Sequence, residues 1–327
     1  MLKMAKKRTE YPINPDFKVI SNLNPPLNKL TLPIFVRSTR MLYNNEKTTD
    51  KVKVEKVKIP ARDGVNLQTL IYTPKGLPEK NAPCLINYHG GGFVLPAMPY
   101  HYSIAKEYAV QAKCKVIFVD YRLAPKHPFP YAVNDCFDTY KWVLDHAEQL
   151  GIDADRIALG GDSAGGNLST VTCIMAHDND LKMPRGQMLI YPYISVDPQF
   201  ESMQKYNDTP MCNTYDVNKY AEYYVPYTSV ERRDYVSPME ASCLDKMPDC
   251  YMETAEFDCL HDGALLYARK LKACNVHVYL NETKGTVHAY DIVLGSKYVK
   301  EVIKKRSEFL RWLFYDKQPA HLQVYEM

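Results

Sequence analysis

Long apolar runs are missing from this sequence of 327 residues. No segment approaches the roughly 18 consecutive apolar residues that a membrane-spanning helix requires. The charged first ten residues have no apolar stretch behind them, so the sequence contains no recognisable export signal. We therefore expect a cytoplasmic protein without stable membrane association.

A large excess of one charge is missing as well. The chain has 41 lysine and arginine residues against 38 aspartate and glutamate residues, which gives a net charge of +3. Nucleic-acid-binding domains usually carry a basic surface, so we expect no nucleic-acid partner. Two short basic clusters, Lys6-Lys7-Arg8 and Lys304-Lys305-Arg306, are expected on a solvated terminus and on the exposed face of the last helix.

Patterns that bind metals or form disulfide frameworks are also missing. The nine cysteines are an odd number without a CxxC pair, and the histidines form neither an HExxH motif nor a cluster with cysteines. These features predict reduced thiols, no metal site and no cofactor. Gly/Ser-rich linkers and repeats are missing from residue 50 onward, which indicates one continuous domain there.

The most informative segment that is present is GDSAG at residues 161–165. It matches the GxSxG pattern, in which a serine nucleophile sits on a sharp turn between a strand and a helix. Residues 156–160 form a short apolar run and residues 166–176 can continue as a helix, so the local context fits. Ser163 is the candidate nucleophile. The backbone N–H of Ala164, at the start of the helix, is a candidate donor to an oxyanion.

A second glycine-rich motif, His89-Gly90-Gly91-Gly92, follows an apolar run at residues 83–88. Consecutive glycines after a strand let bare backbone amides approach a substrate, because no side chain stands in the way. We expect the amides of Gly90, Gly91 and Ala164 to form an oxyanion hole. Together the two motifs predict an acyl-transfer site.

Strand and helix patterns alternate along most of the chain, which predicts a mostly parallel sheet with helices on both faces. Two early strands with a turn at residues 62–64 form a meander opening, and about eight strands result. The predicted strands are residues 51–60, 66–72, 83–88, 115–120, 156–160, 186–191, 249–254 and 276–280. The predicted helices are residues 102–112, 131–148 and 296–314, besides the one after Ser163.

Residues 196–235 interrupt this alternation and are predicted to form an inserted helical cap. The segment has no strand pattern but is rich in aromatic residues: Phe200, Tyr206, Tyr215, Tyr220, Tyr223, Tyr224, Tyr227 and Tyr235. These rings either pack a surface helix against the sheet or line a substrate pocket, where amphipathic rings suit a half-wet site. Residues 1–45 look appended to the core. They become helix-like from residue 28 to 43, with Pro33 interrupting.

A serine nucleophile needs a histidine base and an acid that orients the histidine, in the chain order Ser, Asp or Glu, His. Among the later histidines, His277 falls within a predicted strand and His321 in a polar tail, whereas His288 follows a strand and a loop. His288 is therefore the candidate base, preferred also over His261. The acid is expected at the end of the strand at residues 249–254. Asp258 remains once Glu256 is taken as an exposed loop charge and Asp262 as a helix cap.

With these motifs the sequence resembles the hormone-sensitive lipase family of α/β-hydrolases, specifically its bacterial acetyl esterases and short-chain carboxylesterases. The matching stretches are His89-Gly90-Gly91-Gly92-Phe93, YRLAPKHPFP at residues 121–130, GDSAGGN at residues 161–167, and Tyr191-Pro192. The family's Asp-Pro-Leu-Arg-Asp motif appears as Asp258-Cys259-Leu260-His261-Asp262, and its His-Gly-Phe motif as His288-Ala289-Tyr290. Both keep the catalytic residue and change its neighbours.

The resemblance implies an α/β-hydrolase domain at residues 46–327, capped by residues 1–45 and by the insertion at 196–235. It implies a serine carboxylesterase that hydrolyses small, short-chain acyl esters, with Ser163, Asp258 and His288 as the triad. Asp162 is interpreted as scaffolding of the turn, with a catalytic role as the alternative. An amidase or peptidase with the same triad and a non-catalytic small-molecule binder remain alternatives. A homo-oligomer is compatible with the sequence.

Overall fold

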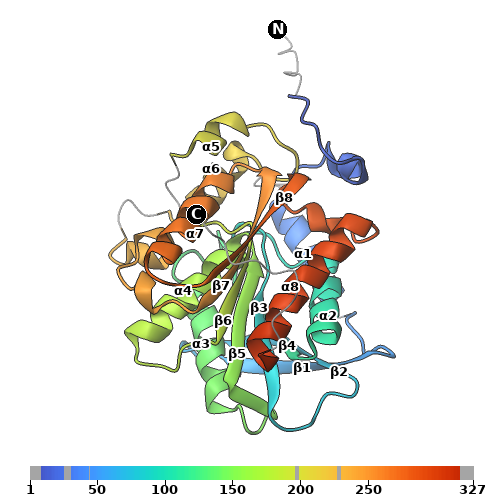
Figure 1. Cartoon of the computed structure of the whole chain (residues 1–327), viewed down its shortest axis with the longest axis vertical. Helices are drawn as coiled ribbons and strands as arrows, with labels where there is room; N and C mark the ends of the chain where they lie inside the picture. Colours follow the sequence, from blue (N-terminus) through green and yellow to red (C-terminus); the bar gives the residue numbers. More distant parts are fainter. Residues whose placement is uncertain (1–8, 26–30, 44, 196–198, 227–229, 317–327) are drawn as a thin grey trace.

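The computed structural model describes residues 9–25, 31–43, 45–195, 199–226 and 230–316, without the side chains of residues 40–43. Within these residues, eight strands form one sheet at the centre of the molecule (Figure 1). The strands are β1 (Val52–Pro60), β2 (Asn66–Pro74), β3 (Ala82–Tyr88), β4 (Lys115–Asp120), β5 (Ile152–Asp162), β6 (Gly186–Ile190), β7 (Asp249–Phe257) and β8 (Val278–Val287).

The order of the strands in the sheet is β1-β2-β4-β3-β5-β6-β7-β8. β1 pairs with β2, and β2 with β4, in antiparallel fashion, whereas all later pairs are parallel. The prediction of a mostly parallel, eight-stranded sheet is confirmed. Because the carboxyl ends of β3, β5, β7 and β8 lie at the same edge, the loops that follow these strands can converge there.

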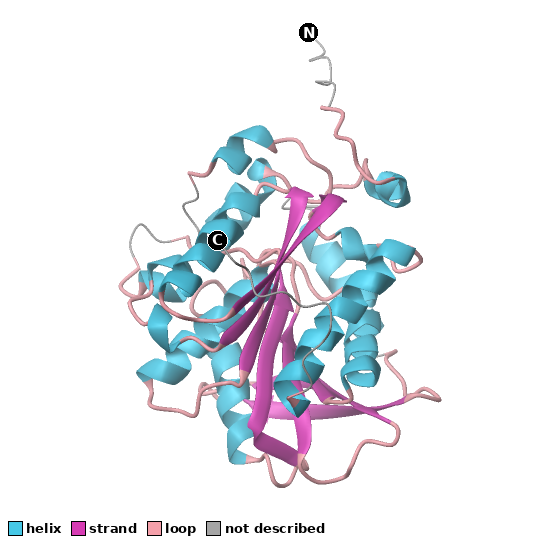
Figure 2. Ribbon diagram, in the orientation of Figure 1, coloured by secondary structure: helices cyan, strands magenta, loops and turns pink. Residues whose placement is uncertain are grey.

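Helices cover both faces of the sheet (Figure 2). α2 and α8 pack together on one face, and α3, α4 and α7 lie on the other (Figure 1). The helices are α1 (Leu32–Tyr43), α2 (Pro99–Ala112), α3 (Tyr131–Asp145), α4 (Ala164–Asp178), α5 (Glu201–Lys205), α6 (Thr214–Tyr224), α7 (His261–Ala273) and α8 (Lys297–Tyr315).

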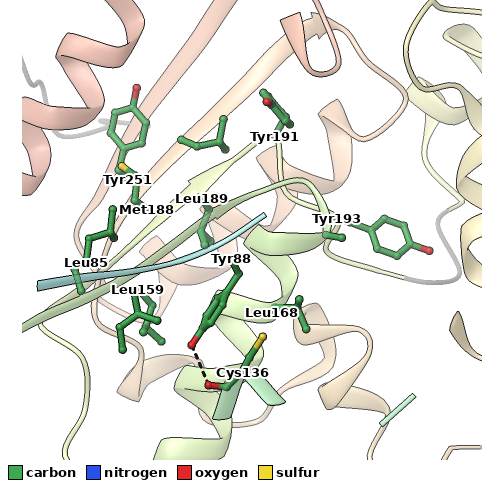
Figure 3. Close-up of a cluster of buried hydrophobic side chains, with 14 of the residues drawn as sticks. Leu85, Tyr88, Cys136, Leu159, Leu168, Met188, Leu189, Tyr191, Tyr193 and Tyr251 are labelled. Carbon is green, nitrogen blue, oxygen red and sulfur yellow. Dashed lines mark hydrogen bonds between the residues drawn. The ribbon is translucent and has the colours of Figure 1, made fainter. Parts of the chain in front are cut away.

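The core lies between the sheet and these helices. Every residue of β3 is buried, as expected for a parallel strand covered on both faces. Residues 164–176 of α4 are also all buried, and their small side chains let the helix lie close to the sheet. Figure 3 shows the packing around Tyr88, whose hydroxyl donates a hydrogen bond of 3.1 Å to the carbonyl of Cys136. The two glycine motifs therefore follow strands that are anchored in this buried core.

The structure corrects the sequence predictions in several places. β8 continues to Val287, well beyond the predicted residue 280, and His277 lies just outside it with an exposed side chain. Pro33 does not interrupt α1 but lies in its first turn, where the missing N–H has no partner to lose. Arg306 was expected on the exposed face of α8, yet its side chain is 1 % exposed. Lys6, Lys7, Arg8, Tyr227 and His321 lie outside the described residues.

Candidate active site

Ser163 sits on the turn between β5 and α4, as the GxSxG pattern predicts. Its backbone has φ 54° and ψ −117°, a strained conformation that sets the side chain at the top of the sheet. A Cβ on the neighbouring Gly165 would lie 2.0 Å from the carbonyl oxygen of Tyr88. Only glycine therefore lets α4 begin so close to the end of β3.

Ser163, His288 and Asp258 come together in one hydrogen-bonded line. The Oγ of Ser163 lies 2.9 Å from Nε2 of His288, and Nδ1 of His288 lies 2.7 Å from Oδ2 of Asp258. The other carboxylate oxygen of Asp258 accepts the backbone N–H of Leu260 at 2.9 Å. All three side chains are buried. Asp258 can thus hold Nδ1–H of the imidazole, which leaves Nε2 free to accept the serine proton.

The electrostatics of His288 follow from this pairing. Burial disfavours the charged imidazolium, but the facing carboxylate of Asp258 outweighs burial, with smaller contributions from Cys212 and Asp162. The net effect raises the pKa of His288 from 6.5 to about 9. A base of this strength readily removes a proton from an adjacent hydroxyl once it is in its neutral form.

Hydrogen bonds fix the orientation of the glycine loop after β3. The hydroxyl of Tyr121 donates to the carbonyl of His89 at 2.7 Å, and Nδ1 of His89 lies 2.6 Å from the carbonyl oxygen of Gly90. The carbonyl of Gly91 accepts the N–H groups of residues 94 and 95. In a trans peptide the N–H points opposite to the carbonyl. The N–H groups of Gly91 and Gly92 therefore point away from these partners, and both residues line the cavity in front of Ser163.

The N–H of Gly90 has a different partner, because it donates to Oδ1 of Asp162 at 3.0 Å. Oδ2 of Asp162 lies 3.2 Å from Nε2 of His101, whose Nδ1 accepts the N–H of Met98 at 2.9 Å. This acceptor role places the imidazole proton on Nε2, from which it is donated to Asp162. Burial opposes ionisation, but His101, His89 and the Gly90 amide outweigh it and lower the pKa of Asp162.

These contacts conflict with the expectation that Gly90 donates to an oxyanion, since its hydrogen is already engaged. They agree with the interpretation of Asp162 as scaffolding. Gly92 and His101 also line the cavity in front of Ser163. The sequence did not single out Gly92 within the glycine run, and it gave no signal for His101. Their positions depend on the direction in which the peptide groups of the glycine loop point, which the sequence does not specify.

A cavity of about 280 Å³ opens in front of Ser163 and His288. The N-terminal segment and the insertion both contribute apolar side chains to its wall: Leu23, Phe35, Met211, Cys212 and Tyr220. Tyr220 of α6 is thus a lining residue, whereas Tyr224 is a packing residue whose ring stacks on Phe93 at 3.8 Å. Tyr215 is 65 % exposed and does neither. Each interpretation of the tyrosines therefore holds for part of the set.

The rejected acids have roles that differ from those expected. Glu256 is only partly exposed, and it accepts the N–H of Gly285 at 2.7 Å near the end of β8, just before His288. Asp262 accepts the N–H of Ser202 at 2.8 Å and so connects α7 to the insertion rather than capping its own helix. His261 pairs with Asp262 and lies outside the triad.

Comparisons with known proteins agree with this geometry. A family model described as "alpha/beta hydrolase fold" matches residues 85–292. The chain belongs to this family. The resemblance to its hormone-sensitive-lipase-like esterases is confirmed by relatives among the curated proteins and the solved structures.

An arylesterase of Saccharolobus solfataricus is 35 % identical over 75 % of this chain and 76 % of its own length. An ethyl acetate hydrolase of Pseudomonas putida is 33 % identical over 72 % of this chain and 75 % of its own. A Pyrobaculum calidifontis esterase structure has a TM-score of 0.82 and 30 % identity, and the match covers 92 % of this chain and 98 % of that one. This α/β-hydrolase is a carboxylic ester hydrolase.

No helix among the described residues is both long and apolar enough to cross a membrane. The described residues also contain no group of three or more His, Cys, Asp or Glu side chains that could hold a metal ion.

Proposed function

We propose that Ser163, His288 and Asp258 hydrolyse small, short-chain acyl esters through an acyl-enzyme. The line of hydrogen bonds from Ser163 through His288 to Asp258 carries this proposal. The proton of Ser163 moves to Nε2 of His288 while Oγ bonds to the acyl carbon. His288 then gives that proton to the leaving alcohol as the bond between the acyl carbon and the alcohol oxygen breaks. In the second stage a water molecule gives a proton to His288 and attacks the acyl carbon, and Ser163 takes the proton back as it leaves. Asp258 stabilises the imidazolium at both stages.

The oxyanion hole of this proposal consists of the N–H groups of Gly91, Gly92 and Ala164. The N–H groups of Gly91 and Gly92 are assigned because the carbonyls that precede them are hydrogen-bonded on the opposite side of the loop. Ala164 is assigned because it lies at the N-terminus of α4, where amide groups lack helical partners. Gly90 is replaced in this role because it donates to Asp162. Such donors typically contribute 10²- to 10³-fold to kcat.

Substrate size is proposed from the cavity. A volume of about 280 Å³ with a mainly apolar wall suits a short acyl group and a compact alcohol. Residues 1–45 and 196–235 act as the cap in this proposal, since Phe35 comes from the first segment and Met211 from the second. All nine thiols are free, which supports the proposal of a reducing, cytoplasmic location.

The deciding experiment is hydrolysis of p-nitrophenyl esters of increasing acyl length by the unaltered protein and by Ser163→Ala. We expect the highest kcat/KM on acetate or butyrate, and about a 10⁶-fold loss of kcat in the variant. An unchanged melting temperature would show that the variant is folded. Full activity in folded Ser163→Ala would overturn the assignment of the nucleophile.

The amidase alternative is tested with a matched pair of substrates, an anilide and a phenyl ester of the same acid. We expect the ester to be hydrolysed faster by orders of magnitude. Comparable kcat/KM values would instead favour an amidase with the same triad.

A further inference from the structure

Arg306 lies at the centre of a buried cluster of charges beneath the active site. Its Nη2 donates to Oε1 of Glu253 at 2.5 Å, and its Nη1 donates to Oδ2 of Asp291 at 2.9 Å. The three side chains are at most 2 % exposed. A buried pair of this kind is weak evidence for stability, because removal of the charges from water offsets their attraction. Stability alone therefore does not explain why three charged side chains are buried here.

The two carboxylates belong to the two segments that carry the acid and the base of the triad. Glu253 lies on β7, five residues before Asp258, and Asp291 lies three residues after His288. One guanidinium on α8 therefore joins the strand that leads to the catalytic acid with the turn that follows the catalytic base.

A second contact leads from the cluster to the imidazole itself. The hydroxyl of Tyr191 donates to Oδ1 of Asp291 at 2.7 Å. The ring of Tyr191 lies against the ring of His288, with centroids 4.7 Å apart and planes inclined by 59°. Asp291 thus fixes the side chain whose ring packs against the catalytic histidine.

The turn that carries His288 requires such support. Ala289 has φ 53°, a left-handed conformation that costs a non-glycine residue roughly 1–2 kcal/mol. The next residue, Tyr290, donates its hydroxyl to Oε1 of Glu253 at 2.8 Å. The turn is therefore held on both sides of Ala289: by the Asp258 bond to His288, and by the cluster's bonds to Tyr290 and Asp291.

We propose that Arg306 is a positioning residue for the catalytic histidine and acts through Asp291 and Tyr191. Arg306 fixes Asp291, Asp291 fixes the Tyr191 hydroxyl, and the Tyr191 ring holds His288 in line with Ser163. The inference rests on the proposed role of His288 as the base. Its consequence is that losing this chain of contacts lowers kcat more than it raises KM, because the substrate cavity is unchanged.

The test uses Tyr191→Phe, Asp291→Asn and the double variant in the full chain. Each single variant should lower kcat about 10- to 100-fold on p-nitrophenyl acetate, with KM changed less than about twofold. The double variant should lose no more than the worse single variant, since both act through one contact. Arg306→Lys should retain more kcat than Arg306→Met, because it keeps a cation between the two carboxylates.

The matched control is Tyr140→Phe, which removes the hydroxyl of a buried tyrosine that donates to the carbonyl of Lys182. It should lower the melting temperature to a similar degree while leaving kcat unchanged. If Tyr191→Phe and Asp291→Asn behave like this control, or if their losses in kcat multiply in the double variant, the proposal is overturned. Activity in folded Ser163→Ala would instead refute the proposed function, so the two failures are distinguishable.

Discussion

The carboxylate of Asp162 accepts the backbone N–H of Gly90 at 3.0 Å and so ties the nucleophile turn to the glycine loop that faces it. The two residues lie 72 positions apart in the chain. The bond sets the separation between the two parts of the proposed oxyanion hole, one on the loop after β3 and one at the start of α4. Catalysis should therefore depend on Asp162 through the position of the glycine loop that it holds.

Asp162→Asn tests this dependence. The asparagine oxygen can still accept from Gly90, but its NH₂ group then faces the Nε2–H of His101, and two donors oppose each other. We expect kcat to fall roughly tenfold with little change in KM, a part of the 10²- to 10³-fold effect of a lost oxyanion donor. Steady-state kinetics on p-nitrophenyl acetate measures both constants.

The matched control is Asp178→Asn, which loses an ion pair with Arg232 at the surface. It should leave kcat unchanged. Wild-type kcat in Asp162→Asn would show that the spacing of the loop does not depend on this carboxylate.

The pH dependence of the reaction follows from the His288–Asp258 pair. Only neutral His288 can accept the serine proton, and its pKa is raised to about 9. kcat/KM should therefore rise with pH from 6 toward 9 and fall about tenfold per pH unit well below that value. In Asp258→Asn the main cause of the shift is lost, so the midpoint should move toward 6.5 while kcat drops about 10⁴-fold.

Initial rates from pH 5 to 10, at substrate concentrations far below KM, give this profile. The controls are the spontaneous hydrolysis of the ester and the recovery of activity after each incubation. A flat profile above pH 7 in the unaltered protein would contradict the raised pKa.

Contact between the cap and the oxyanion loop is tested at Gly92. Its φ is +60°, and a Cβ there would lie 2.2 Å from the ring of Tyr220 on α6. Gly92→Ala should therefore displace either the loop or the ring and lower kcat/KM by at least about 100-fold. Adding Tyr220→Ala makes room for the methyl group, so the double variant should recover part of the loss.

Gly76→Ala separates this contact from backbone strain. Gly76 has φ +80° but no atom within 4 Å of its added Cβ. Its substitution should cost about 1 kcal/mol in stability and leave kcat/KM unchanged. If Tyr220→Ala gives no recovery, the effect of Gly92→Ala is strain alone.

The sequence predicted those features of the molecule that depend on short, local patterns of residues. Short apolar runs predicted the strands of the parallel part of the sheet, because strands covered on both faces are continuously apolar. The alternation of valine with charged residues predicted the edge strand β1. GxSxG predicted the turn at Ser163, since that backbone requires small neighbours. His288 and Asp258 followed from chain order, because the loops after β7 and β8 meet at the carboxyl edge of the sheet.

Long-range polar contacts were the part that sequence could not predict. Arg306 follows two lysines and reads as one more exposed cation, because its partners Glu253 and Asp291 are distant in the chain. The hydrogen bond from the N–H of Gly90 to Asp162 was not predictable either, since a run of glycines does not specify the direction of each amide group. These contacts are specified by tertiary packing rather than by a local pattern.

Phe35→Ala tests whether the N-terminal segment limits the acyl group. Phe35 lies on α1 and lines the cavity in front of Ser163. Removing its ring enlarges the cavity, and each additional methylene bound in an apolar pocket is worth about 1–3 kcal/mol. The ratio of kcat/KM for the octanoate to that for the acetate should therefore rise at least tenfold.

The neighbouring Ile34→Ala is the matched control, because Ile34 is 71 % exposed on the same helix. It removes a similar amount of apolar side chain without changing the cavity, so its octanoate-to-acetate ratio should equal that of the unaltered protein. An equal rise in both variants would mean that a looser α1, rather than the lost ring, admits the longer chain. A rise confined to Phe35→Ala would place the acyl group against α1 and make the N-terminal segment part of the substrate pocket.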